Sequence, residues 1–110
     1  MNLNDIQFID HKSYYCCEDP GINHIDVHVS IVESDITTAF LNWSHNKIIN
    51  MDGTFETIKT YYPIVKTYLI AIWDWDTINQ TIILNLGFTL KGNGIIGTPP
   101  LTVLIYQKLL

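Results

Sequence analysis

The sequence contains no arginine, and its six lysines face eleven aspartates and glutamates, so the formal net charge of the 110 residues is −5. Nucleic-acid-binding surfaces need positive charge against the phosphates. Arginine is the residue that holds phosphates and guanine edges through paired hydrogen bonds. The composition therefore predicts a protein that does not bind nucleic acid.

The sequence also lacks a long apolar run and a cystine framework. No apolar run approaches the roughly 20 residues that cross a bilayer, and residues 1–5 have neither the positive start nor the apolar stretch of a signal peptide. The two cysteines, Cys16 and Cys17, are adjacent, an arrangement in which a disulfide strains the peptide between them. We therefore expect one domain over residues 1–110, located in the cytoplasm and not associated with a membrane.

The clearest strand covers residues 24–32, where apolar and polar residues alternate with a period of two. One face carries Ile25, Val27, Val29 and Ile31. The other face carries His24, Asp26, His28 and Ser30. This pattern predicts a strand with one face on the core and the other toward solvent or a site.

The next segments read as helices. Ser34 or Asp35 is a suitable N-cap for a helix over residues 35–43, in which apolar residues recur at helical spacing: Ile36, Ala39, Phe40 and Trp43. A turn is expected at residues 52–53 and a shorter helix over residues 54–60. Pro63 should end that helix, because proline in a helix interior costs about 3 kcal/mol.

The second half of the chain begins with a nearly continuous apolar run over residues 68–75, which predicts a central strand. Asp76 can cap a following helix, which Gly87 should end with Phe88 folded back on Ile83. Two antiparallel strands are expected over residues 88–91 and 101–107. The Gly- and Pro-rich loop between them, which contains two isoleucines, is interpreted as a mobile loop or a homodimer contact.

This order of strands and helices predicts a mixed α/β (α+β) domain with parallel neighbours joined by right-handed crossovers. The strand over residues 68–75, the helix after Asp76, its ending in Leu86, Gly87 and Phe88, and the final strand pair together resemble the GNAT acetyltransferase superfamily. The pattern resembles small phage-encoded GNAT-like proteins in particular, over residues 24–107.

The resemblance implies a single GNAT-like domain, with a central mixed sheet and helices on both faces. It implies that residues 24–32 and 68–75 lie side by side and parallel, with an acetyl-CoA site in the cleft between them. The cofactor-binding residues expected from it are Thr37, Thr38, Asp76 and Asn79, and the implied activity is N-acetyl transfer.

His28 and Glu33 are the candidate catalytic residues, because a histidine and a carboxylate close in sequence could deprotonate an amine. His28 also belongs to the row of His24, Asp26 and His28, which is either a metal site or the solvated face of a strand. We expect no bound metal.

Several residues depart from the family pattern. Residues 33–38, which correspond to the pyrophosphate loop, contain no glycine and two carboxylates that would repel phosphates. Ile83 occupies the position where many of these enzymes have a proton-donating tyrosine. The alternative hypothesis is therefore a non-enzymatic, phage-type interaction or inhibitor protein that binds a host or phage protein in the host cytoplasm.

Two further motifs have two possible roles each, one functional and one structural. Cys16 or Cys17 could be a nucleophile if a basic neighbour lowers its pKa, or both could be buried thiols. Trp73 and Trp75 could line a pocket or form a partner-binding hot spot, or they could pack in the core.

Overall fold

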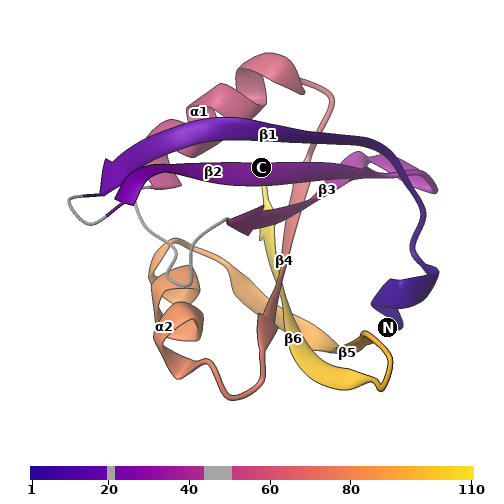
Figure 1. The fold of residues 1–110 in the computed structure, drawn as a ribbon. Helices are drawn as coiled ribbons and strands as arrows, with labels where there is room; N and C mark the ends of the chain where they lie inside the picture. Colours follow the sequence, from indigo (N-terminus) through magenta and orange to yellow (C-terminus); the bar gives the residue numbers. More distant parts are fainter. Residues whose placement is uncertain (20–21, 44–50) are drawn as a thin grey trace.

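In the computed structural model, the described residues form one six-stranded mixed sheet and two α-helices (Figure 1). The structure describes the backbone of residues 1–19, 22–43 and 51–110, and the side chains of residues 1–10, 27–42, 55–56 and 58–110. The elements in chain order are a 3-10 turn η1 (Leu3–Asp5), β1 (Phe8–Asp19), β2 (Ile22–Val32), β3 (Asp35–Trp43), α1 (Met51–Tyr61), β4 (Thr67–Trp73), α2 (Thr77–Asn85), β5 (Thr89–Ile96) and β6 (Leu101–Leu109).

The strand order across the sheet is β1-β2-β3-β4-β6-β5. The strands β1, β2 and β3 form an antiparallel meander, β3 and β4 are parallel, and β4, β6 and β5 are antiparallel neighbours. The prediction that residues 24–32 and 68–75 lie side by side and parallel is therefore wrong. The strand β3 separates them, and β2 runs antiparallel to β4.

Residues 35–43 form the strand β3 and not the predicted helix. Three β-branched residues, Ile36, Thr37 and Thr38, favour an extended backbone at its start. Burial then alternates: Ala39 and Leu41 lie in the core on one face, and Phe40 packs on the other face. A strand that is apolar on both faces can show helical spacing by coincidence, which explains the wrong prediction.

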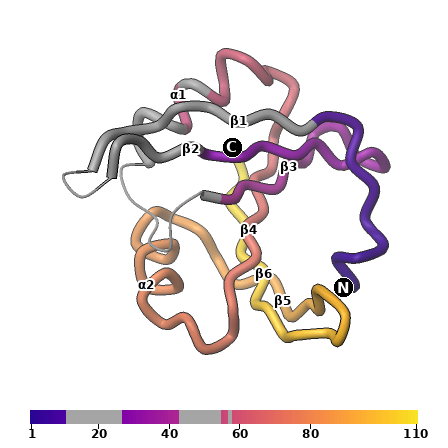
Figure 2. Tube along the Cα trace, viewed as in Figure 1, coloured from indigo at the N-terminus to yellow at the C-terminus, as the bar shows by residue number. Residues whose placement is uncertain are grey.

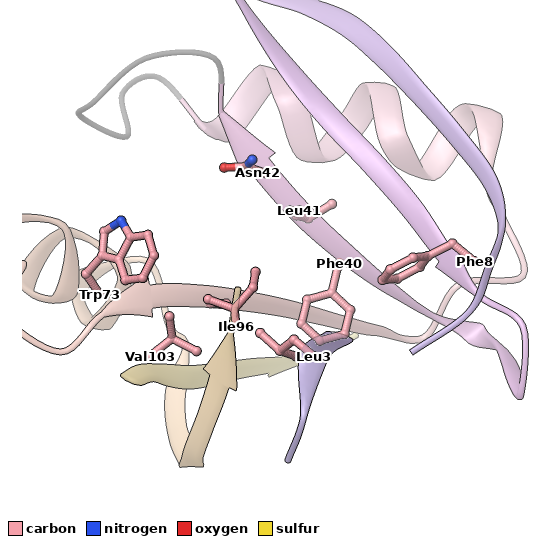
Figure 3. A pocket seen from close by; sticks show the side chains of 9 residues that line it. Leu3, Phe8, Phe40, Leu41, Asn42, Trp73, Ile96 and Val103 are labelled. Carbon is pink, nitrogen blue, oxygen red and sulfur yellow. The ribbon is translucent and has the colours of Figure 1, made fainter. Parts of the chain in front are cut away.

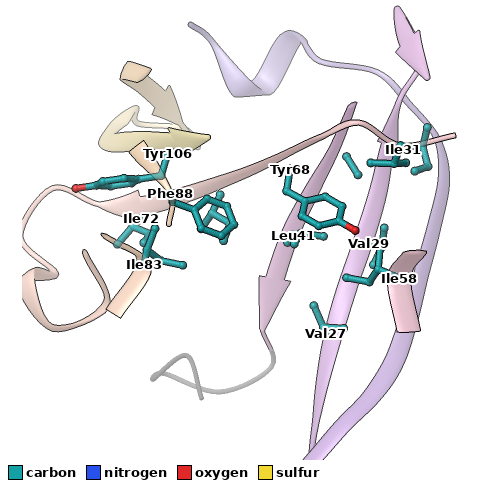
Figure 4. Packing of buried hydrophobic residues seen from close by; sticks show 13 residues of the cluster. Val27, Val29, Ile31, Leu41, Ile58, Tyr68, Ile72, Ile83, Phe88 and Tyr106 are labelled. Carbon is teal, nitrogen blue, oxygen red and sulfur yellow. The ribbon is translucent and has the colours of Figure 1, made fainter. Parts of the chain in front are cut away.

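Both helices lie on the same face of the sheet (Figures 1 and 4). Ile58 of α1 and Ile83 of α2 join one core cluster with residues from five strands or their flanks, among them Val27, Val29, Ile31, Ala39, Leu41, Tyr68, Ile70, Ile72, Phe88 and Tyr106. The two crossovers, β3-α1-β4 and β4-α2-β5, advance in the same direction across the sheet, and right-handed crossovers then place their helices on one face. The predicted GNAT-like α/β domain with helices on both faces is therefore wrong, and the described chain is mostly sheet.

Several local predictions are confirmed. Helix α1 ends at Tyr61, two residues before Pro63, and Asp76 caps α2 by accepting a hydrogen bond from the backbone N–H of Asn79. Gly87 adopts a φ of 91°, and the backbone N–H of Phe88 donates to the carbonyl of Ile83 at 3.2 Å. This is the predicted Schellman ending, with Phe88 and Ile83 both buried in the core.

Other boundaries differ from the predictions. Residues 52–53 lie in the first turn of α1, not in a separate turn, and residues 11–19 continue the strand β1. The strand β5 extends to Ile96, so the two isoleucines of the expected loop are strand residues and the turn is reduced to residues 97–100. The turn expected at residues 20–21 lies outside the described residues.

Candidate functional site

The parallel strands β3 and β4 separate after a short paired stretch. They pair at three positions, Thr38 with Thr67, Ala39 with Tyr68, and Phe40 with Leu69. In the part of the chain that the structure describes, neither strand pairs with the other beyond that point. Both strand edges therefore turn backbone N–H and C=O groups toward a gap, as sheet edges do.

A pocket of about 360 Å³ lies at this gap (Figure 3). We call it the β3–β4 pocket. Its lining residues come from both strands, from the β5–β6 hairpin and from the N-terminal segment: Leu3, Phe8, Phe40, Leu41, Asn42, Ala71, Trp73, Ile96 and Val103. Leu41 packs in the core on the helix-covered face and still lines this pocket, so the pocket reaches into the gap between the strands.

The pocket opens on the face of the sheet opposite the two helices, which we call the helix-free face. A second apolar cluster, formed by Leu69, Val103 and Ile105, lies on this face. Val103 lines the pocket, and so do Phe40, Ala71 and Trp73, which pack against the cluster. The rings of Phe8 and Phe40 meet edge to face at 5.9 Å and close one end. Ala71 also lines the pocket and presents only a methyl group to it.

The N-terminal segment forms part of the pocket wall and is held by the β5–β6 hairpin. Asn4 donates to the carbonyl of Gly97 at 3.1 Å and accepts from its N–H at 3.0 Å. The N–H of Ile95 donates to the carbonyl of Met1 at 3.0 Å. Figure 2 shows this segment beside the hairpin. These contacts place Leu3 against the pocket.

An open, acidic hollow adjoins the pocket and shares Phe40 with it. Its volume is about 690 Å³, and its charged lining residues are Asp5, Glu33, Asp35 and Lys91. We call it the acidic hollow. Met1 with its N-terminal ammonium group also lines the hollow, so three carboxylates and two ammonium groups leave it a small negative charge, which favours cationic ligands.

The predicted cofactor-binding residues Thr37 and Thr38 lie at the start of β3. Their hydroxyl groups donate to the carboxylate of Asp35 at 2.6 and 2.9 Å, and the backbone N–H of Thr37 donates to it at 3.1 Å. These hydrogen bonds lower the pKa of Asp35, and the one from the Thr37 hydroxyl has the largest effect. The expected helix N-terminus for a pyrophosphate does not exist here, because residues 35–43 are a strand.

The other two predicted cofactor-binding residues, Asp76 and Asn79, lie beyond the opposite end of β4. The carboxylate of Asp76 accepts from the backbone N–H of Asn79 at 3.2 Å and from its side-chain amide at 2.7 Å. The strand from Thr67 to Trp73 separates this cap from Thr38, a span of roughly 20 Å at about 3.3 Å per residue. The structure thus does not bring the four predicted residues together.

The two candidate catalytic residues are also apart. His28 pairs with Asn42 across β2 and β3, so its side chain is on the helix-free face, next to a residue of the β3–β4 pocket. Glu33 is exposed in the β2–β3 turn and lines the acidic hollow. Five residues of strand put roughly 16 Å between their backbones, so the two side chains do not act on one atom.

The remaining motifs are only partly described. Cys16 and Cys17 belong to β1, and His24 and Asp26 to β2, but these four side chains are outside the described residues. Among the side chains that are described, no group of three or more His, Cys, Asp or Glu residues is arranged to hold a metal ion.

Sequence reasoning missed the main pocket residues Phe40, Ala71 and Asn42. It assigned the segment that contains Phe40 and Asn42 to a helix, and Ala71 was only one letter of an apolar run. The tryptophan pair was the available signal: Trp73 lines the pocket and stacks on Trp75, with ring centroids 6.5 Å apart and planes inclined by 6°.

A comparison of the chain with protein-family models, with curated proteins and with solved structures finds no match. Within the described ranges, no helix has the length and apolar character that crossing a membrane requires.

Proposed function

We propose that the β3–β4 pocket binds the pantetheine arm of an acyl-CoA thioester, such as acetyl-CoA. The observation that carries this proposal is the divergence of two parallel strands beside an apolar pocket. The pantetheine arm is a narrow, uncharged chain with two amide groups and a thioester. Its amides can exchange hydrogen bonds with the open strand edges, and its methylene groups can lie on Phe40 and Ala71.

The role that we propose is binding, with transfer chemistry reduced or lost. A backbone N–H at the open edge of a strand can stabilise the oxyanion of an acyl-transfer step. The leaving thiolate also needs a proton, and Ile83, at the position of the family's tyrosine, is buried in the core and cannot donate one. His28 is the described histidine on the pocket's face, and it is one strand away from the gap.

Calorimetric titration with acetyl-CoA, CoA and pantetheine tests the proposal. We expect all three to bind wild-type protein. Ala71→Trp should abolish the binding of all three, because the indole would occupy the pocket that Ala71 lines. Thr81→Trp, at an exposed position of α2, is the matched control and should bind as wild type does. The absence of heat with all three ligands at millimolar concentration would overturn the proposal.

A second candidate function is the capture of a basic segment of a partner protein. The observation that favours it is the acidic hollow next to exposed apolar side chains on the helix-free face, among them Phe8, which is 43% exposed. An extended peptide with alternating lysine and valine has complementary charge and side chains. Such a peptide should bind wild-type protein more tightly than its glutamate–valine counterpart. Equal affinities would exclude this candidate.

A further inference from the structure

Trp75 is a large aromatic residue that the fold leaves 72% exposed. One face of its ring lies parallel to Trp73, with 6.5 Å between centroids and 6° between planes. Because most of the residue is in solvent, the indole keeps an open face. An indole with an open face offers a large flat apolar surface on which a planar group can stack.

The turn that carries Trp75 is fixed by hydrogen bonds at both ends. The carbonyl of Trp73 accepts from the N–H of Asp76 at 3.0 Å and from the side-chain amide of Gln80 at 3.0 Å. The carbonyl of Trp75 accepts from the N–H of Thr77 at 3.0 Å. The backbone that carries the ring therefore does not have to be ordered when a ligand stacks on it, which reduces the entropic cost of binding.

The ring pair of Trp73 and Trp75 begins at the β3–β4 pocket and ends in solvent. The strands β3 and β4 pair at the Thr67 end of β4, so the gap is open toward Trp73, whose ring lines the pocket. The ring of Trp75 lies next to that of Trp73, outside the lining of the pocket. A ligand with its acyl end near Phe40 would therefore extend past Trp73 and bring its far end to Trp75.

We infer that Trp75 stacks on the adenine ring of CoA, an inference that rests on the proposed function. Adenine is the planar group at the far end of CoA from the thioester, and every base presents a π-face to an indole. The exposed carboxylate of Asp74 lies in the same turn, where it would repel the CoA phosphates. The adenine contact would then offset an unfavourable charge interaction.

Parallel titrations with CoA and pantetheine separate this inference from the proposed function, because pantetheine has the arm without the adenine and the phosphates. Trp75→Ala should weaken CoA binding by about 5-fold to about 140-fold, the range for stacking of one base, and leave pantetheine binding unchanged. Trp75→Phe should restore most of the CoA affinity. Asp74→Asn should strengthen CoA binding and leave pantetheine binding unchanged.

All three variants change exposed side chains, so circular dichroism should confirm an unaltered fold. If Trp75→Ala binds CoA as wild type does, while pantetheine still binds, the inference about Trp75 is wrong and the proposed function stands. If wild-type protein binds neither ligand, both are wrong. If Trp75→Ala weakens CoA and pantetheine equally, Trp75 supports the pocket and does not contact adenine.

Discussion

The two faces of the sheet are built from alternate residues of the same strands, yet they differ in how they are covered. On the helix-covered face, Ile70 and Ile72 of β4 are buried beneath residues such as Ile83 and Phe88. On the helix-free face, their neighbours Ala71 and Trp73 are only partly buried and line a pocket. The difference indicates that one face mainly stabilises the fold and that the other is available for a ligand.

A pair of alanine substitutions should show the largest difference between the faces. Phe88→Ala, on the helix-covered face, should lower the free energy of unfolding by about 3–5 kcal/mol, the usual cost of removing a buried aromatic ring. Trp73→Ala, on the helix-free face, should cost no more than about half as much, because its ring already borders solvent. Urea denaturation of both variants measures the two losses, and equal losses would show that the two faces contribute alike.

The second prediction concerns Tyr68, a buried residue of the helix-covered face. Its ring stacks on Phe55 at 5.5 Å. Its buried hydroxyl (Figure 4) has no hydrogen-bond partner among the side chains that the structure describes. Burial, and then the charge of Glu56, raises the pKa of Tyr68 to about 12 from 10.0. Tyr68→Phe should raise the free energy of unfolding near neutral pH by about 1 kcal/mol, because it removes a buried hydroxyl without a partner.

The raised pKa also predicts the direction of the pH dependence. The folded state favours the neutral phenol, so this contribution to stability is complete below pH 10 and is lost as the pH rises through 12. The wild-type protein should therefore lose about 2 kcal/mol more than Tyr68→Phe over that interval. Tyr61→Phe, at an exposed position, is the control and should follow the wild type. Parallel losses in wild type and Tyr68→Phe would contradict the prediction.

The sequence alone predicts those elements whose signals lie within a few neighbouring residues. The alternation in residues 24–32, the cap at Asp76 and the stop at Gly87 each depend on neighbours a few positions away. The strand β3 was missed because its two apolar faces are filled by partners distant in sequence, and this error changed the predicted neighbour of β4. The same error led to the wrong placement of helices on both faces, because a helix over residues 35–43 would have been a third helix packed on the sheet.

The pocket could not be predicted because its residues meet only through the strand order. Phe40 and Ala71 lie on strands whose pairing ends after three positions, and no sequence pattern marks where two parallel strands separate. The sequence did identify Trp73 and Trp75 as an unusual pair. It could not tell which ring lines the pocket and which one is exposed, because β4 ends between them.

The smallest expected effect lies at the border of the helix-free face, where Asp35 accepts hydrogen bonds from Thr37 and Thr38. These bonds lower the pKa of Asp35 from 3.8, so their contribution to stability is present above that value and is lost as the pH falls through the lowered pKa.

The double variant Thr37→Val with Thr38→Val removes both hydroxyl donors and keeps β-branched side chains. Its thermal midpoint should fall slightly below that of the wild type near neutral pH, and the two midpoints should converge in strong acid. The effect should be small because Asp35 is exposed and solvent screens its charge. A difference between the midpoints that is as large in strong acid as at neutral pH would show that the threonines act through packing and not through the carboxylate.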